Sequence, residues 1–417
     1  MEKHSSIDKN QYGFQRKKST IKLLENLVDQ INDGFDKNLH IVCLFVDFSR
    51  AFETINHDKL IQILERIGIR GHLLDWFRGY IYGRTYAVQI GKYTSKERAL
   101  LMGVPQGSIL GPLLYLIYVN DVSACFERCK YYVYADDTLI MGKHKDVEEA
   151  NRMVQEDFNR FQRWAHDKQL IINPKKTKIM HFRTPAHKTP STITILAHND
   201  KCLHEQITKC KCTEQIEMVR QIKYLGVYLD DKMSWEIHIE KLRKQLRCLS
   251  FNFYFIREYV PFEVLLVIYK ALVLSIINYG ISVYGQASSH RIQRLQRTHN
   301  LILKHLSFSQ QKARINNAIG EDWIQMSIKQ LFVMRIILNN HLDSRNWEKV
   351  DHDYGTRAHN YGNFKLERSY NKYGERRKTV CVRKVFNMLP EEILNLTKMS
   401  TFKKRIKEWI MQNISYQ

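Results

Sequence analysis

Two apolar runs of strand length carry acidic residues at their ends or centre, and this pattern constrains the fold more than any other feature of the chain. The first run, Ile41–Val46, is followed directly by Asp47, and the second, Tyr131–Ile140, is interrupted by Asp136 and Asp137. Carboxylates between apolar strands are unfavourable, because like charges repel and burial disfavours the charged form. A divalent cation removes both penalties and so favours a metal site. The competing interpretation is that Asp136 and Asp137 form only a hairpin turn, where aspartate is common.

Charge points to a polyanionic partner. The 417 residues include 65 Lys and Arg against 43 Asp and Glu, a net charge of +22. Nucleic acid is the usual partner of so basic a chain, with an anionic membrane surface as the second choice. The most apolar stretch, residues 262–284, contains Glu263 and Lys270, which predicts a buried helix of a soluble protein and no membrane span. An apolar share of 44% also excludes a disordered chain.

The eight cysteines are scattered, and no secretory signal opens the sequence. We therefore expect reduced thiols in an intracellular protein. Cys202, His204, Cys210 and Cys212 lie close together, but their spacing fits no common zinc finger or knuckle, so coincidental cysteines are the better interpretation.

Hydrophobic periodicity predicts an α+β fold, with strands and helices first and helices later. Beyond the two strand runs, the pattern of the first half predicts a pair of strands at 86–90 and 96–102, joined around Gly91. Residues 184–217 are expected to form a polar connector or a weak hairpin. Helices are expected at 57–67, 72–80, 109–122, 147–170, 237–259, 262–277, 291–306 and 401–411.

The segment Gly103–Leu114 places Gly and Pro in a turn that leads into an apolar helix. Gly107 would permit close approach of a base pair, and Gln106 could hydrogen-bond to it. A strand-to-helix turn without any ligand explains the same residues equally well, so this segment alone decides nothing.

Taken in order, six segments resemble the motifs of non-LTR retrotransposon reverse transcriptases, in particular those of the jockey-like elements. The resemblance covers nearly the whole chain, and the order and gaps of the motifs make it highly specific. The segments are Gln11–Phe14 with Ser19 and Thr20, Phe45–Phe52, Gly103–Leu114, Tyr134–Asp137, Asn173–Thr177 and Tyr224–Val227.

The resemblance implies a role for each matching residue. Asp47, Asp136 and Asp137 would bind two Mg²⁺ ions, which Mn²⁺ can replace, and Lys176 would assist catalysis near the pyrophosphate. The ring of Phe52 would clash with a 2′-hydroxyl and so select dNTPs. Competing interpretations are a core phenylalanine at position 52 and an ordinary exposed lysine at 176. The implied nucleotide-binding residues are Phe52, Gln106, Gly107 and Arg50.

The resemblance further implies a right-hand polymerase palm with partial fingers at 1–184, a connector at 185–220, and a mostly helical thumb and C-terminal nucleic-acid-binding region at 221–417. The stretch 368–384 is basic, with Tyr370 and Tyr373 interleaved, which suits backbone neutralisation with base stacking. A solvated basic face is the alternative. The candidate nucleic-acid contacts are Arg368, Arg376, Arg377 and Lys378.

The implied activity is RNA-directed DNA synthesis that extends a DNA primer on an RNA template, in the nucleus, with the cytoplasm as a second location. The family carries further fingers motifs and usually an endonuclease upstream of the position of Gln11, so the resemblance predicts an N-terminally truncated chain. A catalytically impaired nucleic-acid-binding remnant therefore stays open as the alternative. An RNA-templated RNA polymerase would usually have Gly at the position of Ala135.

Overall fold

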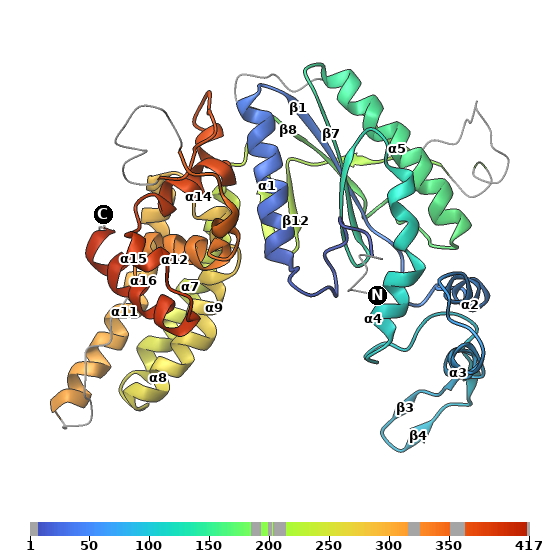
Figure 1. Ribbon diagram of the computed structural model, residues 1–417. Helices are drawn as coiled ribbons and strands as arrows, with labels where there is room; N and C mark the ends of the chain where they lie inside the picture. The colour runs from blue at the N-terminus through green and yellow to red at the C-terminus, as the bar shows by residue number, and fades with distance from the viewer. Residues whose placement is uncertain are drawn as a thin grey trace. The chain divides into compact units, whose positions relative to one another are not determined.

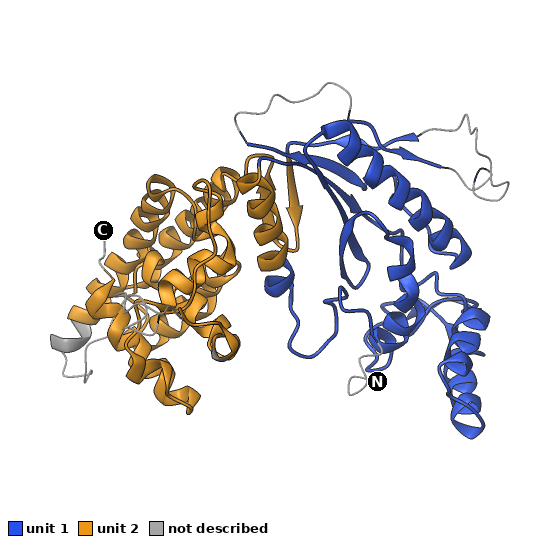
Figure 2. Ribbon diagram, turned by 45° about the horizontal axis from the view of Figure 1, so that its top comes forward, with its two compact units in different colours: residues 1–23, 38–220 blue, residues 24–37, 221–417 orange. Residues whose placement is uncertain are grey.

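The computed structural model describes residues 7–184, 193–198, 202, 214–315, 326–350 and 363–414. The chain forms two compact units (Figure 2): residues 1–23 and 38–220 make up the first, and residues 24–37 and 221–417 the second. Helix α1, Thr20–Asp36, therefore contributes residues to both. In the part of the chain described, no helix has the length and apolar character to span a membrane.

A five-stranded mixed sheet forms the centre of the first unit, in the order β11-β8-β1-β7-β6. Figure 1 labels its strands β8, β1 and β7. Strand β1 pairs antiparallel with β7 and β8, β7 pairs antiparallel with β6, and β11 joins β8 in parallel. All residues from Ile41 to Val46 are buried, which confirms the predicted strand with two covered faces. The strands are β1 His40–Val46, β6 Lys130–Tyr134, β7 Asp137–His144, β8 Lys178–Phe182 and β11 Glu217–Met218.

Helix α5, Val147–Asp167, packs against β1 and β7. The side chain of Asp146 caps it by accepting hydrogen bonds from the backbone N of Glu148 and of Glu149, both at 3.3 Å. Its buried residues recur at helical spacing, as the amphipathic pattern predicts: Ala150, Val154, Phe158, Phe161 and Ala165.

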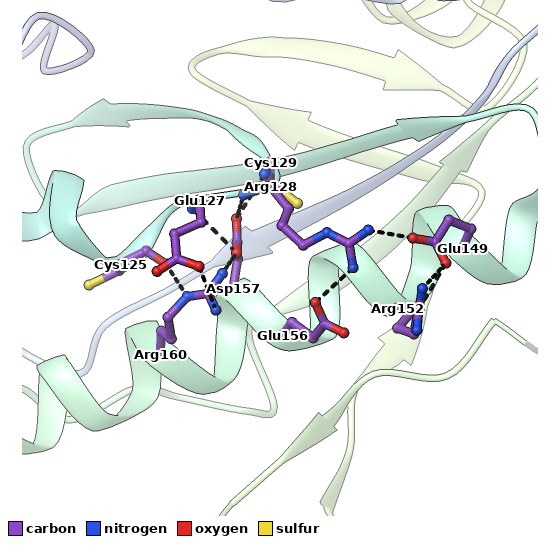
Figure 3. A network of polar contacts seen from close by, with 9 residues as sticks. All are labelled: Cys125, Glu127, Arg128, Cys129, Glu149, Arg152, Glu156, Asp157 and Arg160. Carbon is purple, nitrogen blue, oxygen red and sulfur yellow. Dashed lines mark hydrogen bonds and ion pairs between the residues drawn. The ribbon is translucent and has the colours of Figure 1, made fainter.

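A polar network joins α5 to the loop that precedes β6 (Figure 3). The fully buried Asp157 carboxylate accepts hydrogen bonds from the backbone N of Arg128 at 3.2 Å and of Cys129 at 2.8 Å, and it pairs with Arg160. Because β6 begins at Lys130, this network fixes the start of that strand on α5.

Replacing Asp157 by alanine is expected to lower the free energy of unfolding by about 3 kcal/mol, because it leaves partly buried backbone N–H groups and a guanidinium without their acceptor. Urea unfolding measures the loss. The matched control is Glu156→Ala on the same helix, which removes a partly exposed ion pair with Arg128 and is expected to cost less than about 1 kcal/mol. Equal losses in both variants would contradict this role of Asp157.

Three helices share a hydrophobic core with the sheet: α2 His57–Arg66, α3 His72–Ile81 and α4 Gly111–Tyr118. They confirm the helices predicted at 57–67 and 72–80. The helix predicted at 109–122 is shorter and continues as a 3₁₀ helix, Asn120–Cys125. The Asn, Asp and Ser residues of that segment favour local side-chain bonding to the backbone over an α-helix.

The predicted strand pair around Gly91 forms two short ladders in place of one continuous hairpin. Strand β2, Thr85–Tyr86, pairs with β5, Arg98–Ala99, and β3, Gln89–Ile90, pairs with β4, Tyr93–Thr94. All of these residues are exposed, so no apolar face is available to hold one register along the whole hairpin.

The described part of the predicted connector contributes a weak hairpin, β9 Leu196–Ala197 with β10 Glu214–Gln215. Reduced thiols are confirmed at Cys43, Cys125, Cys129, Cys248 and Cys381. The expectation of reduced thiols is wrong at Cys202, which is disulfide-bonded. His204, Cys210 and Cys212 lie outside the described residues.

The second unit opens with a hairpin of β12, Gln221–Tyr224, and β13, Val227–Asp230. Leu225 and Gly226 form its two-residue turn with φ of 43° and 80°. The hydroxyl of Tyr279 donates to the carbonyl of Leu225 at 2.7 Å.

Helices build the rest of this unit, and those predicted at 237–259, 291–306 and 401–411 are confirmed. The one predicted at 262–277 contains a π-helical turn, Tyr269–Leu274, between α8 and α9. Helices α12 and α14 were not predicted; with α16 they surround a core that includes Phe386 and Phe402. The helices are α7 Glu236–Ile256, α8 Phe262–Ile268, α9 Ser275–Asn278, α10 Ile281–Tyr284, α11 Ser289–Ile315, α12 Ile328–Asn340, α14 Lys378–Phe386, α15 Glu391–Leu394 and α16 Met399–Asn413.

Two buried histidines make the second unit sensitive to acid. Burial lowers the pKa of His238 and of His299 to about 4 each. The unfolded chain binds these protons near pH 6.5, so stability is complete at neutral pH and falls as the pH drops from 6.5 to 4, by about 3 kcal/mol for each histidine. Urea unfolding at several pH values should show that the free energy of unfolding falls between pH 6.5 and 4. The fall should be smaller in His299→Gln. A slope that changes no more than in the exposed-residue control His72→Gln would contradict the assignment.

Candidate active site

Asp47 and the turn at 136–137 lie at the same end of neighbouring strands. In the antiparallel β1–β7 ladder Val46 pairs with Thr138, so Asp47 and Asp137 are the next residues on either side. Asp137 also pairs with Tyr134 of β6, which makes Ala135 and Asp136 the two turn residues of the β6–β7 hairpin. The sheet register thus brings together the acidic residues that the sequence places 90 positions apart.

The carboxylates lie close enough for their charges to act on Asp137 and Asp47. Burial, together with the charges of Asp136 and Asp47, raises the pKa of Asp137 to about 6. Burial also raises the pKa of Asp47, against the opposing effect of Lys176, and Asp136 adds to the rise. Like charges gathered in a partly buried place are the arrangement that a divalent cation stabilises.

Asp47 has an oxygen free to bind such a cation. Its Oδ2 is shielded from solvent and accepts no hydrogen bond from any described residue, and Nζ of Lys176 lies 3.8 Å away. Within the described ranges, no three His, Cys, Asp or Glu side chains are already gathered in metal-binding positions. Carboxylate oxygens are the ligands that Mg²⁺ prefers. Because the three side chains are not yet in metal-binding positions, Asp47, Asp136 and Asp137 would have to move to bind the ion.

The N-terminal segment braces the acidic hairpin. The backbone N of Ala135, a residue with φ of 56°, donates to Oε1 of Gln11 at 3.0 Å, and the N of Gly13 donates to the same oxygen at 2.7 Å. The N of Tyr12 donates to the carbonyl of Val133 at 2.7 Å. Residues 11–13 therefore hold the turn in its left-handed conformation, a role for Gln11 that the sequence reasoning did not predict.

Gly13 has no room for a side chain, because a Cβ there would lie 2.5 Å from the backbone N of Ala135. Gly13→Ala is expected to displace the turn and to cost about 1–3 kcal/mol of stability, as overpacking does. Gly79→Ala in helix α3 is the matched control, since its Cβ would meet no atom within 4 Å. Thermal unfolding compares the two variants. A Gly13→Ala variant as stable as Gly79→Ala would show that the close packing of Gly13 against Ala135 does not support the hairpin.

The turn at 173–177 supports Asp47 from the other side. The backbone N of Asn173 donates to the carbonyl of Asp47 at 2.8 Å, and the N of Asp47 donates to Oγ1 of Thr177 at 3.3 Å. The side chain of Lys176 is 69% exposed, so it can move toward or away from Asp47.

Phe52 lies half-buried on a short aromatic stack. Its ring stacks on Tyr115 with centroids 4.3 Å apart, and the ring of Phe14 meets its edge at 6.3 Å. The backbone N of Val104 donates to the carbonyl of Phe52 at 3.1 Å, and a Cβ on Gly103 would clash with the backbone of Glu53. The loops after β1 and before α4 are thus held against each other.

The other predicted nucleotide-binding residues lie in these two loops. Nε2 of Gln106 donates to Glu53 at 3.3 Å, and Glu53 also pairs with the highly exposed Arg50 at 3.7 Å. Gly107 has φ of 78° and open space where a side chain would lie, as the prediction of close approach requires.

A family model described as reverse transcriptase (RNA-dependent DNA polymerase) matches residues 1–229, more than half of the chain. The chain belongs to the reverse transcriptase family. The α+β fold class predicted for it is confirmed by the mixed sheet with its helical C-terminal region.

Several retrotransposon polymerases resemble this reverse transcriptase. The probable RNA-directed DNA polymerase of the Drosophila melanogaster transposon X-element is 27% identical over 73% of this chain, and that of the mobile element jockey of the same species is 26% identical over 72%. The chain spans about a third of these relatives, 32% of each. Telomerase of Candida tropicalis, solved in complex with a TWJ fragment of telomeric RNA, aligns with 96% of this chain and 53% of its own at 10% identity, but its TM-score of 0.38 adds nothing to the assignment.

The basic stretch of this reverse transcriptase requires a correction at Arg377. Its guanidinium is buried and pairs with Asp33 at 3.5 Å, Asp36 at 3.6 Å and Glu367 at 3.3 Å, so it is neutralised inside the second unit and is no free phosphate ligand. Tyr373 is buried against Phe35, which removes it as a platform for a base.

The other residues of the stretch keep accessible charge. Arg368 is exposed and lies over the exposed ring of Tyr370 at 5.2 Å, which suits a nucleic-acid contact. Arg376 and Lys378 are half-buried and line a cavity of the second unit.

Proposed function

We propose that this reverse transcriptase is the RNA-directed DNA polymerase of a non-LTR retrotransposon, which extends a DNA 3′-end on an RNA template. The observation that carries the proposal is the register that sets Asp47 beside the 136–137 turn, with carboxylate charges close enough to raise the pKa of Asp137. The family match and the likeness to the X-element and jockey polymerases support it.

In the proposed reaction the chain's own residues position the substrates. The ring of Phe52, supported by Tyr115, would lie against the sugar of the incoming dNTP and exclude a 2′-hydroxyl. Gln106 and the open space at Gly107 would receive the nascent base pair, and Arg50 the triphosphate. Lys176 would move from Asp47 to donate a proton to the leaving pyrophosphate.

Asp47, Asp136 and Asp137 would hold the divalent ions in this proposal. Two Mg²⁺ ions, when bound, supply activation of the primer 3′-hydroxyl and stabilisation of charge on the phosphates. The shielded Oδ2 of Asp47 and the mutual repulsion of the carboxylates favour that occupancy.

The nucleic-acid partners follow from the same proposal. Basic residues of the second unit, including Arg368, would contact the phosphates of the template–primer hybrid, with affinity that falls as salt rises. In relatives of this kind the primer would be a chromosomal DNA end, so the nucleus is the proposed place of action.

Primer extension tests the proposal directly. The purified chain receives a primed RNA template, dNTPs and Mg²⁺ beside a variant with both Asp136→Asn and Asp137→Asn. We expect product only from the parent chain and only with the metal. Equal product from both chains would remove the catalytic claim, and salt-sensitive binding without any extension would favour a non-catalytic nucleic-acid-binding remnant.

A further inference from the structure

The second unit contains a cavity that the polymerase reaction does not use. Its volume is about 30 Å³, it is partly open to solvent, and it lies among α1, α10, α12 and α14. Its polar lining consists of Glu25, Asp29, Ser282, Gln286, Asn340, Arg376 and Lys378. All of these residues belong to the same unit.

Arg376 and Lys378 line this cavity. The charge of Lys378 acts on Asp29 of the same lining, whereas Arg376 has no side-chain acceptor among the described residues. Among the described residues, the guanidinium of Arg376 makes no ion pair, and its aromatic contact is Tyr373, 5.6 Å from the ring centroid. Burial lowers the pKa of Arg376, and the charge of Arg291 lowers it further. Arg377, the next residue, has three acidic partners. The fold therefore neutralises Arg377 and leaves Arg376, which lines the cavity, without an acidic partner among the described residues.

Two buried polar atoms of the lining also lack partners. Oδ1 of Asn340, whose side chain is 2% exposed, and Oγ of Ser282, at 8%, have no hydrogen bond with any described residue. Buried polar groups normally form hydrogen bonds, and a buried group that forms none destabilises the fold. These atoms add a free acceptor at Asn340 and a free hydroxyl at Ser282.

The carboxylates of the lining are already engaged. Glu25 accepts a hydrogen bond from Nδ2 of Asn339 at 2.8 Å, and Asp29 accepts one from the backbone N of Lys378 at 2.5 Å. Burial raises the pKa of Asp29. The unused binding capacity of the cavity is consequently that of cationic donors, one hydroxyl and one amide oxygen, which disfavours a metal cation.

We propose that this cavity binds a terminal phosphate group. Its anionic oxygens accept from Arg376, Lys378 and Ser282, and charge-assisted bonds of this kind are the strong ones. A phosphomonoester has a second pKa of about 6, so it also supplies an O–H donor for Asn340 when singly protonated. A free nucleotide and the phosphorylated end of a nucleic acid share this chemistry.

Calorimetric titration of the full chain tests the proposal, with NaCl holding the ionic strength constant. The probes are inorganic phosphate, AMP beside adenosine, and one short single-stranded DNA with a 5′-phosphate or a 5′-hydroxyl. We expect phosphate and AMP to bind and adenosine to fail. A gain from the 5′-phosphate on DNA would identify a nucleic-acid end as the source, and equal binding of both DNA forms would identify the free nucleotide.

Three variants locate the binding. Arg376→Gln is expected to weaken binding of phosphate and AMP about tenfold or more, whereas Arg405→Gln, at an exposed arginine of α16 outside the lining, should change affinity less than about twofold. Asn340→Leu removes the unpartnered amide oxygen at similar volume, together with the hydrogen bond from Nδ2 to the carbonyl of Ile336 in the same helix. It should weaken binding of phosphate and AMP without a large change in melting temperature. Absence of phosphate binding, or equal affinity in all variants, would overturn the proposal whether or not the chain extends a primer.

Discussion

Replacing Asp47 by asparagine is expected to reduce the rate of primer extension about 10³-fold, equivalent to about 4 kcal/mol of lost transition-state stabilisation. Asparagine keeps the size of the side chain and removes the charge that β1 sets beside Asp137. Because the Asp47 charge raises the pKa of Asp137, the same variant should also lower that pKa from about 6. Single-turnover extension with saturating dNTP measures the rate.

Asp146→Asn is the matched control for this experiment. Asp146 caps helix α5, and asparagine caps helices about as well, so the variant loses one charge of the same unit without touching the carboxylate site. It should extend primers at close to the parental rate. An Asp47→Asn chain that is as active as Asp146→Asn would exclude Asp47 from catalysis.

Replacing Phe52 by alanine is expected to lower the preference for dNTPs over rNTPs about a hundredfold, the scale of discrimination that shape alone supplies in a pocket. The Phe52 ring stacks on Tyr115 and makes an edge contact with Phe14, so these two rings fix its position. From that position it can exclude a 2′-hydroxyl. Competing incorporation of dNTP and rNTP by one preparation measures the ratio.

A general loss of core packing would not produce that change in ratio. Phe126 is a half-buried ring of the same hydrophobic core, stacked on Tyr131 with centroids 4.2 Å apart. Phe126→Ala should reduce stability and leave the ratio of dNTP to rNTP incorporation unchanged. If both variants keep the parental ratio, Phe52 is only a core residue.

The parts of the fold that sequence predicted well are those with local signals. The apolar run Ile41–Val46 forms the predicted buried strand. The break that Asp136 and Asp137 make in the second run is where its two strands meet, with Ala135 and Asp136 in the turn and Asp137 at the start of β7. Because register along a strand sets which residues meet at its end, the pairing of β1 with β7 brings Asp47 to that turn. The two strand assignments alone do not predict this pairing, which only the resemblance to reverse transcriptases implied.

Long-range contacts account for what could not be predicted. The burial of Arg377 depends on Asp36, more than 300 positions earlier, whose carboxylate also accepts the backbone N of Tyr370 at 2.8 Å. Nothing within the stretch 368–384 distinguishes Arg377 from its exposed neighbour Arg368. Likewise, Gln11 supports Ala135 through a single oxygen across 124 positions, and no periodicity marks such a bond.

Crystals of the chain grown with a template–primer, a non-reactive nucleotide and Mn²⁺ test the central claim most directly, through the anomalous scattering of manganese. We predict two manganese peaks at the end of the sheet, with Asp47 and Asp137 among the ligands. Bound nucleotide and template–primer with no manganese at this end of the sheet would contradict the claim. Manganese bound there without Asp47 as a ligand would also contradict it.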